Sequence, residues 1–456
     1  MEQGASLFFV WWAAACLIHA FTIKILSEAG VEIVSSLIFN YHVLLAVSLV
    51  IGFPFVLSIL KSTKTSNVIE NLLQGSYAKF KRLAKKGPTG IISTEEHAKI
   101  QYQLFEELNQ LMDLLVFVPY KEPKSQIIEG IGELLRYYVK LKPKFPEDFF
   151  KIDQQIHDDI SFRTLKSLLA EVEKSHTFYE QKSFRMIGNV YNVFLDKGEF
   201  DLSTLCVEQL SQVGKTALEC DDQELIEVIT VRLNTYFRFA LKHGQHNNEP
   251  RNLYNLVFHY GQFLSYLVEH RQVDRVKTCI GYFVFYGQQC FNAIPRARSL
   301  AFILDILASE MQKLMQIIYQ NNWERKLQQE LLQKFLLFDN FQDMDKEIAI
   351  QFFSQNHGIR LLHIGLALFY LNQNEKEFAE TIAKDTLQDL LLMGEPLFSK
   401  TMDTIFARLQ YSGAKFWEDT DRGNVNIYFT PYQNEIENFK KLQVKFKLES
   451  QKKIPA

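Results

Sequence analysis

The sequence predicts an all-α protein, in which an N-terminal two-helix transmembrane hairpin precedes a cytoplasmic α-helical-repeat domain and a short β-strand lies near the C-terminus. Three observations support this prediction. Phe is common (38 residues) while Gly (20) and Pro (11) are scarce, which favours long helices over turn-rich strands. Two uncharged apolar stretches of near-spanning length lie close to the start of the chain. Beyond residue 91, helical patterns of about twenty residues follow one another across short polar breaks.

The predicted hairpin covers residues 1–62, with spans at about residues 5–24 and 37–60. The second span contains twenty consecutive uncharged residues, 41–60, and a helix of that length matches a hydrocarbon core about 30 Å thick. Lys24 ends the first span, where its side chain could reach the membrane surface. A signal peptide is the competing interpretation, but no basic residue precedes the first apolar stretch. The sequence therefore predicts an integral membrane protein.

A cluster of basic residues follows the second span, within a predicted juxtamembrane helix and linker over residues 63–90. By the positive-inside rule this cluster lies in the cytoplasm, so both termini are expected on the cytoplasmic side of the plasma (inner) membrane. The same side chains are candidates for contact with anionic lipid, the alternative being a solvated helical stem. They are Lys61, Lys64, Lys79, Lys81, Arg82, Lys85 and Lys86.

Residues 91–412 form the predicted helical-repeat domain. Short breaks between long helices imply antiparallel neighbours, and a series of such pairs is typical of an α-solenoid. Residues 218–236 and 267–286 also share a polar elbow followed by an aromatic-rich helix, about fifty residues apart. The tetratricopeptide pattern is absent, and a single helical bundle is the alternative. The expected helices cover residues 94–118, 125–141, 160–196, 202–219, 221–242, 250–270, 272–292, 296–320, 323–337, 345–372, 375–392 and 396–411.

The last segment, residues 413–456, is a predicted C-terminal arm with a basic tail. Residues 425–430 alternate like a strand, and a lone strand must pack on the helices or pair with another chain. The tail is either solvated or a second contact with the membrane surface. Its cations are Lys440, Lys441, Lys445, Lys447, Lys452 and Lys453.

No catalytic, cofactor or metal motif is found in the sequence. His157 followed by two aspartates invites comparison with a divalent-ion site, but the nearest upstream histidine is His97, sixty residues away, and the pattern falls where a helix N-cap is expected. His243 and His246 lie in a predicted polar loop with no cysteine nearby. Gly130 and Gly132 lie within a predicted helix and follow no strand, so they indicate a close helix contact and not a phosphate loop. The sequence predicts no enzyme.

The amino-acid composition limits the kinds of partner that the protein is expected to bind. The formal net charge is −3, so no global field attracts nucleic acid, and none is expected. The five cysteines show no CxxC spacing, which suits reduced, buried thiols in a reducing compartment. Aromatic clusters at 236–239, 258–260 and 282–286 are either core or, on the inner face of a solenoid, a groove for a partner peptide or helix.

These patterns favour a membrane-anchored cytoplasmic scaffold that recruits protein partners or assembles with itself as a homo-oligomer. The alternative is a subunit of an oligomeric membrane pore or transport complex, lined by Asn40 and His42 and kinked at Gly52 and Pro54. A helical hydrolase is the third candidate. Membrane lipid and an unidentified protein are the expected partners, with no cofactor.

Overall fold

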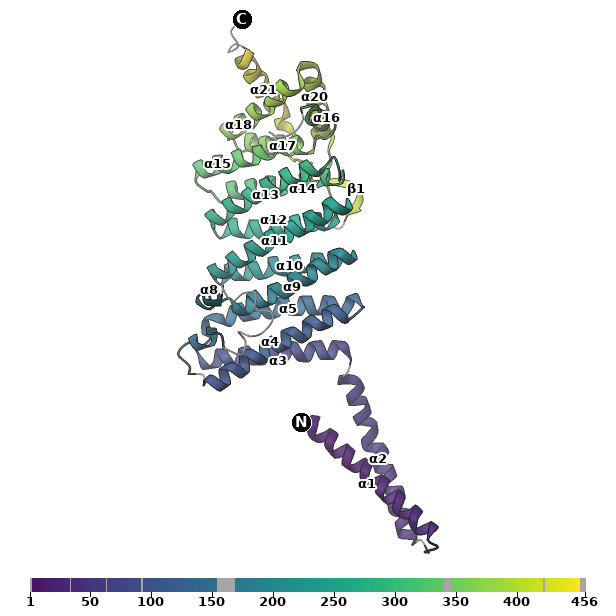
Figure 1. The fold of residues 1–456 in the computed structure, drawn as a ribbon. Helices are drawn as coiled ribbons and strands as arrows, with labels where there is room; N and C mark the ends of the chain where they lie inside the picture. Colours follow the sequence, from purple (N-terminus) through teal and green to yellow (C-terminus); the bar gives the residue numbers. More distant parts are fainter. Residues whose placement is uncertain are drawn as a thin grey trace. The chain divides into compact units, whose positions relative to one another are not determined.

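The computed structural model describes residues 2–32, 34–62, 64–91, 93–153, 169–339, 346–420 and 423–451. It divides into two compact units, Met1–Ser76 and Tyr77–Ala456. Both units are built from α-helices, and a short β-hairpin lies near the end of the second (Figure 1).

The first unit contains a pair of helices, α1 (Glu2–Glu28) and α2 (Ser35–Ser62), that pack against each other. The connection passes through Gly30, whose φ of 73° suits glycine. Polar atoms meet along the contact: Trp12 Nε1 donates to Ser48 Oγ at 3.0 Å, and His19 Nε2 lies 3.2 Å from the carbonyl oxygen of Leu37. The predicted helical hairpin is present, and its two helices are antiparallel.

The predicted transmembrane spans, at about residues 5–24 and 37–60, are wrong. Among the residues that the structure describes, no helix combines the length and the apolar content needed to cross a bilayer. In the first of the two predicted spans, polar and charged residues break up the apolar sequence. In α1, His19 and Thr22 interrupt the apolar residues, and Lys24 and Glu28 place charges in the last turns. The predicted location was that of an integral protein of the plasma (inner) membrane with cytoplasmic termini. Because this prediction depended on the two spans, it is wrong as well.

The second unit begins within α3 (Thr65–Lys86) and continues through α4 (Thr94–Phe117), α5 (Lys121–Leu141), the 3₁₀ turns η1 (Lys142–Lys144) and η2 (Glu147–Phe150), and α8 (Leu169–Lys174). Ser93 caps α4 by accepting a hydrogen bond from the backbone N–H of Glu96. Beyond α8, helices alternate between two layers.

The first layer consists of α9 (Phe178–Lys197), α11 (Gln223–Asn247), α13 (Val273–Ala293), α15 (Arg325–Leu336) and α18 (Lys376–Thr386). The second layer consists of α5, α10 (Phe200–Glu219), α12 (Arg251–Glu269), α14 (Leu300–Gln320) and α17 (Gly358–Asn372). Each helix packs on its neighbours in the same layer and on an adjacent helix of the other layer (Figure 1). The predicted helical-repeat architecture is confirmed.

One turn recurs at each step from the second layer back to the first. It places a non-glycine residue in the left-handed region, at Asp221, Arg271, Asn322 and Asn374, about fifty residues apart. Hydrogen bonds join successive repeats at the same interval: Arg271 Nη2 donates to the carbonyl oxygen of Asn321 at 3.2 Å. The weak sequence echo over residues 218–236 and 267–286 therefore marks a structural repeat.

The close helix contact expected at Gly130 and Gly132 is confirmed on α5. A Cβ atom on Gly132 would lie 2.2 Å from Oε1 of Gln209 on α10, which is shorter than any tolerable contact. Each fully buried Leu, Ile or Phe in this packing contributes about 1.5 to 3 kcal/mol from burial. The two layers therefore share one continuous apolar core.

The end of the chain consists of η4 (Leu337–Asp339) and α16 (Lys346–Gln355) before α17, then α19 (Gln388–Met393), α20 (Glu395–Tyr411), strands β1 (Lys415–Thr420) and β2 (Gly423–Val425), η5 (Gln433–Glu435) and α21 (Ile436–Gln451). The strands pair antiparallel. The strand predicted at residues 425–430 is wrong beyond Val425, because Asn426 forms a turn: its Oδ1 accepts from the backbone N–H of Tyr428 at 3.1 Å.

Candidate functional site

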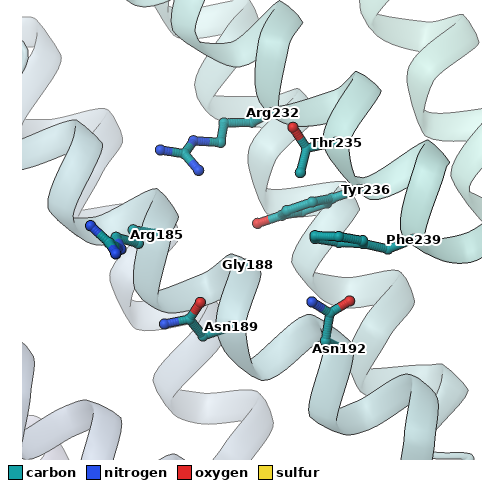
Figure 2. Close-up of a pocket in the computed structure, with 8 residues that line it drawn as sticks. All are labelled: Arg185, Gly188, Asn189, Asn192, Arg232, Thr235, Tyr236 and Phe239. Atoms are coloured by element: carbon teal, nitrogen blue, oxygen red, sulfur yellow. The ribbon is translucent and has the colours of Figure 1, made fainter. Parts of the chain in front are cut away.

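A polar hollow lies between α9 and α11 on the first layer (Figure 2). Its volume is about 300 Å³. The spacing of its lining residues, three or four apart, places each set on one face of its helix. Helix α9 contributes Arg185, Gly188, Asn189 and Asn192, and α11 contributes Arg232, Thr235, Tyr236 and Phe239. Donors from two helices therefore converge on one small volume.

Two arginines face this hollow from opposite helices. Nη2 of Arg232 donates to the neutral amide oxygen of Gln181 at 3.0 Å. Burial lowers the pKa of the Arg232 guanidinium, and the like charge of Arg185 acts in the same direction. The Arg232 guanidinium nevertheless stays charged at neutral pH, because an arginine pKa lies far above 7. Two guanidinium groups therefore line the hollow.

The Tyr236 ring lies at the base of the hollow, stacked on Tyr191 with ring centroids 4.5 Å apart. Gly188 permits this approach, since a Cβ there would lie 3.3 Å from Cε1 of the Tyr236 ring. The side chain is 1% exposed, and its hydroxyl has no hydrogen-bond partner among the described residues. Burial raises the pKa of Tyr236 well above its usual value, so the hydroxyl keeps its proton and can donate it. An unsatisfied buried hydroxyl costs about 1 to 3 kcal/mol.

A second hollow of about 440 Å³ adjoins the first and shares Arg232. Three acids line it, namely Glu171 from α8 and Glu224 and Glu227 from α11. Acidic side chains therefore lie next to the hollow between α9 and α11.

Apolar side chains are exposed on the same layer. Val231 on α11 is 53% exposed, and Phe285 on α13 is 51% exposed. Tyr282 on α13 is also exposed and stacks on Tyr286. The first layer thus presents both charge and apolar area, the combination that aromatic and arginine side chains supply at protein interfaces.

Several of the basic residues predicted to contact lipid form ion pairs between α3 and α4. Arg82 and Lys86 contact the Glu96 carboxylate at 2.7 Å and 2.6 Å, and Lys79 binds Glu107. Lys64, Lys81 and Lys85 are exposed, while the Lys61 side chain lies outside the described residues. Contact of this cluster with lipid stays a prediction.

The pore candidates lie on α2. Asn40 and His42 are exposed, and His42 Nδ1 lies 2.7 Å from the carbonyl oxygen of Ile38. The side chains of Gly52 and Pro54 lie outside the described residues. A pore role would require a membrane span, and none of the helices in the described ranges is long and apolar enough to form one.

Two histidine groups were candidates for metal binding, and the structure describes one of them. His157, Asp158 and Asp159 lie outside the described residues. His243 and His246 lie in the last turns of α11, which extends to Asn247, so the polar loop predicted there is wrong. Within the ranges that the structure describes, no group of three His, Cys, Asp or Glu side chains could hold a metal ion.

The sequence reasoning missed Arg185 and Arg232, and treated Tyr236 as one member of an aromatic cluster. Tyr191 and Tyr236 occupy corresponding places in successive first-layer helices, but Arg185 precedes Tyr191 by six residues whereas Arg232 precedes Tyr236 by four. The two arginines therefore do not share a repeat position, and no local signal in the sequence pairs them.

Comparison with known proteins adds little to this description. No protein-family model matches the chain, and no curated protein matches it in sequence. A solved circular tandem repeat protein, with novel repeat topology and enhanced subunit contact surfaces, is 13% identical, with a TM-score of 0.41. The match covers 99% of this chain and 100% of that one. A similarity at this level says nothing about function. The structure itself therefore defines the class of this protein, which is a helical-repeat protein with a polar hollow on one layer.

Proposed function

We propose that this protein is a helical-repeat scaffold that binds a protein partner on the surface of α9, α11 and α13. The proposal is for binding and not for catalysis. The observation that carries it is the polar hollow lined by side chains of α9 and α11, with the unsatisfied Tyr236 hydroxyl at its base. Exposed aromatic side chains on α13 supply apolar area beside this hollow.

The fold supports this role because a repeat stack offers a long surface built from equivalent helix faces. An arginine guanidinium can donate two parallel hydrogen bonds to one planar anionic group. Aromatic side chains lose little conformational entropy on binding. Interfaces of this kind concentrate their energy in a few such residues. A protein segment that carries an acidic or otherwise anionic group beside apolar residues complements this surface.

The test is capture by the tagged full-length chain from a lysate, compared between charge-reversal variants. Arg232→Glu reverses the charge inside the hollow. Lys400→Glu makes the same change at an exposed position on α20, outside the first layer, and serves as the matched control. Far-ultraviolet circular dichroism establishes that both variants keep their helices.

We expect a partner that binds the unmodified chain and Lys400→Glu but not Arg232→Glu. Equal capture by all three proteins would contradict the proposed surface, and the absence of any captured partner would contradict the scaffold role. Light scattering on the purified chain tells whether the partner is a second copy, since self-association lost on Arg232→Glu alone would identify a homo-oligomer.

A further inference from the structure

We infer that the exposed face of helix α1 binds the same face of a second copy of this chain, so that the protein dimerises through its N-terminal hairpin. This inference goes beyond the scaffold proposal, which concerns the surface of α9, α11 and α13. Three features of the hairpin support it: its exposed apolar area, the placement of its polar groups and the spacing of the exposed residues on α1.

The hairpin of α1, α2 and their connection exposes more apolar area than a monomer usually does. Its exposed large apolar side chains are 42% to 72% accessible: Trp11, Leu17, Ile18, Phe21, Ile25, Val31, Val34, Ile38, Phe39, Val43, Leu45 and Val50. If full exposure is about 60 to 120 Å² for an aliphatic side chain and about 150 to 250 Å² for an aromatic one, they expose about 600 to 1,100 Å². The largest apolar patch of a typical monomer has about 300 to 600 Å², whereas each partner in a stable complex buries about 800 Å². The hairpin thus has the apolar area of one side of a stable interface.

Several polar groups of the hairpin are satisfied inside it and not at its outer face. The Cys16 Sγ atom lies 3.0 Å from Ser48 Oγ, and Thr22 Oγ1 donates to the carbonyl oxygen of Ile18 at 2.8 Å. The other hydrogen bonds across the hairpin, described above, have the same effect. A surface helix of a globular protein usually places its apolar residues inward and its polar residues outward. The reverse arrangement indicates that another surface covers the outer face of this hairpin.

The exposed residues of α1 follow the spacing of a coiled-coil seam. The residues Trp11, Ala15, Ile18, Thr22 and Ile25 are all exposed, and they are separated by four, three, four and three residues in turn. Such a spacing averages about 3.5 residues, which keeps a stripe against one partner helix along its length. The Thr22 hydroxyl bonds within its own helix, so the methyl group is left to face the partner. We call these five residues the α1 stripe.

The α1 stripe is complementary to itself. Ile18 is its central residue, so an antiparallel pair with a two-fold axis at this point brings the two Ile18 side chains together. The same axis places Ala15 opposite Thr22 of the other copy, and Trp11 opposite Ile25 of the other copy. The two small residues let the helices approach each other, and the larger side chains fill the seam on either side. A surface that matches itself under a two-fold axis is what a symmetric homodimer requires.

A lipid surface is the other occupant that an apolar face of this kind could meet, and the charges of the hairpin argue against it. Helices that lie in a membrane interface carry Lys and Arg residues along their polar face. Residues 11–50 contain one cation, Lys24, which lies 3.8 Å from the Glu28 carboxylate. The remaining charged residue in this range is Glu32. Anionic lipid would therefore find no cationic face on residues 11–50, whereas a second copy needs none.

The first measurement is sedimentation of the full chain over a range of micromolar concentrations, for which we expect a discrete dimer. Ile18→Glu places two carboxylates together in the seam and should raise the dimer Kd about a hundredfold or more. Ile18→Leu should keep the dimer. Leu391→Glu puts a carboxylate at an 82% exposed position on α19 and should also keep it. A monomer at every concentration, or a dimer that Ile18→Glu leaves intact, would overturn the inference.

The second measurement locates the interface by cross-linking with a short bis-maleimide. Ile18→Cys should give far more covalent dimer than the unmodified chain, whose Cys16 is half-buried. Leu391→Cys, at the exposed position on α19, should give no more covalent dimer than the unmodified chain. Equal cross-linking of Ile18→Cys and Leu391→Cys would overturn the inference. Circular dichroism establishes that each variant keeps its helices.

Two controls separate the possible outcomes. If the unmodified chain is a monomer that floats with phosphatidylcholine vesicles, and Ile18→Glu does not float, lipid covers the α1 stripe and the inference is wrong. Arg232→Glu should remain a dimer, whatever its effect on the capture of a partner from a lysate. If the dimer is lost in Arg232→Glu and kept in Ile18→Glu, self-association belongs to the surface of α9, α11 and α13. That result would overturn this inference and leave the scaffold proposal standing.

Discussion

The buried ion pair beside α5 offers the sharpest test of how the repeats hold together. Lys142 binds Glu180 Oε1 at 2.8 Å and Asp222 Oδ2 at 2.7 Å, and so joins η1 to α9 and to the turn before α11. The Glu180 side chain is fully buried. Burial raises the pKa of Glu180, and the Lys142 ammonium opposes that rise. Lys142→Met keeps much of the side-chain length and removes the charge that compensates two carboxylates.

The free energy of unfolding should fall in Lys142→Met because Glu180 must then take up a proton to remain buried. Protonating a glutamate of ordinary pKa, near 4.3, costs about 3.7 kcal/mol at pH 7, because each pKa unit corresponds to about 1.36 kcal/mol. Breaking a buried ion pair typically costs about 3 to 5 kcal/mol, in agreement. At pH 5 the same protonation costs only about 1 kcal/mol. The penalty of Lys142→Met should therefore shrink as the pH falls.

The assay is urea unfolding of the full chain followed by circular dichroism at pH 7 and pH 5. Because repeats can unfold in separate steps, hydrogen exchange of peptides from α5 and α9 assigns the loss to this region. The double variant Lys142→Met with Glu180→Gln should regain most of the loss, since no buried charge is then left at residue 180. A loss below about 1 kcal/mol at pH 7, or a loss independent of pH, would refute this reasoning.

Three further results are expected from other parts of the second unit. Burial raises the pKa of Asp305 to about 6 from an ordinary value near 3.9, so the folded protein binds a proton at this residue more tightly than the unfolded chain does. When the pH is lowered from 7.5 to 4.5, the free energy of unfolding should therefore rise by about 2 kcal/mol more in the unmodified chain than in Asp305→Asn, as urea unfolding can measure. A Cβ on Gly214 would lie 2.6 Å from the buried ring of Phe263, so Gly214→Ala should lower the free energy of unfolding by about 1 to 3 kcal/mol. A Cβ on Gly281 would meet nothing within 4 Å, so Gly281→Ala should raise the free energy of unfolding by up to about 1 kcal/mol through helix propensity. Arg325 pairs with two glutamates of α18 at half-exposed positions, so Arg325→Ala should lower the melting temperature only slightly, and less so in 0.5 M salt, as calorimetry can check.

Most of the helical architecture follows from local patterns in the sequence. Helix α10 begins at Phe200 and ends at Glu219, close to the expected residues 202–219. Gly198 with φ of 69° separates it from α9, a position that glycine predicts. The turns at Asp221 and Arg271 lie in the polar breaks that the sequence marks. Local propensity and apolar periodicity agree in this region, so sequence and structure agree as well.

Two of the failures involve contacts between residues far apart in the chain, and a third involves a local turn. The hollow depends on Arg185 and Arg232 meeting across two helices, which no local motif predicts. Apolar length predicted spans near the N-terminus, where polar side chains such as His19 and Ser48 hydrogen-bond across the hairpin. The alternation over residues 425–430 resembled a strand, yet Asn426 turns the chain there.

The hydrogen bond between Tyr428 and Asp305 has a consequence for the order of folding. Most side-chain bonds between repeats join residues about fifty apart, whereas this 2.7 Å bond joins residues 123 apart. Closing a longer loop costs more entropy, and contacts distant in sequence form more slowly. The layered helices can therefore form first, each on its neighbour, while the segment that carries Tyr428 docks in a later kinetic step that fluorescence of the nearby aromatic residues could follow.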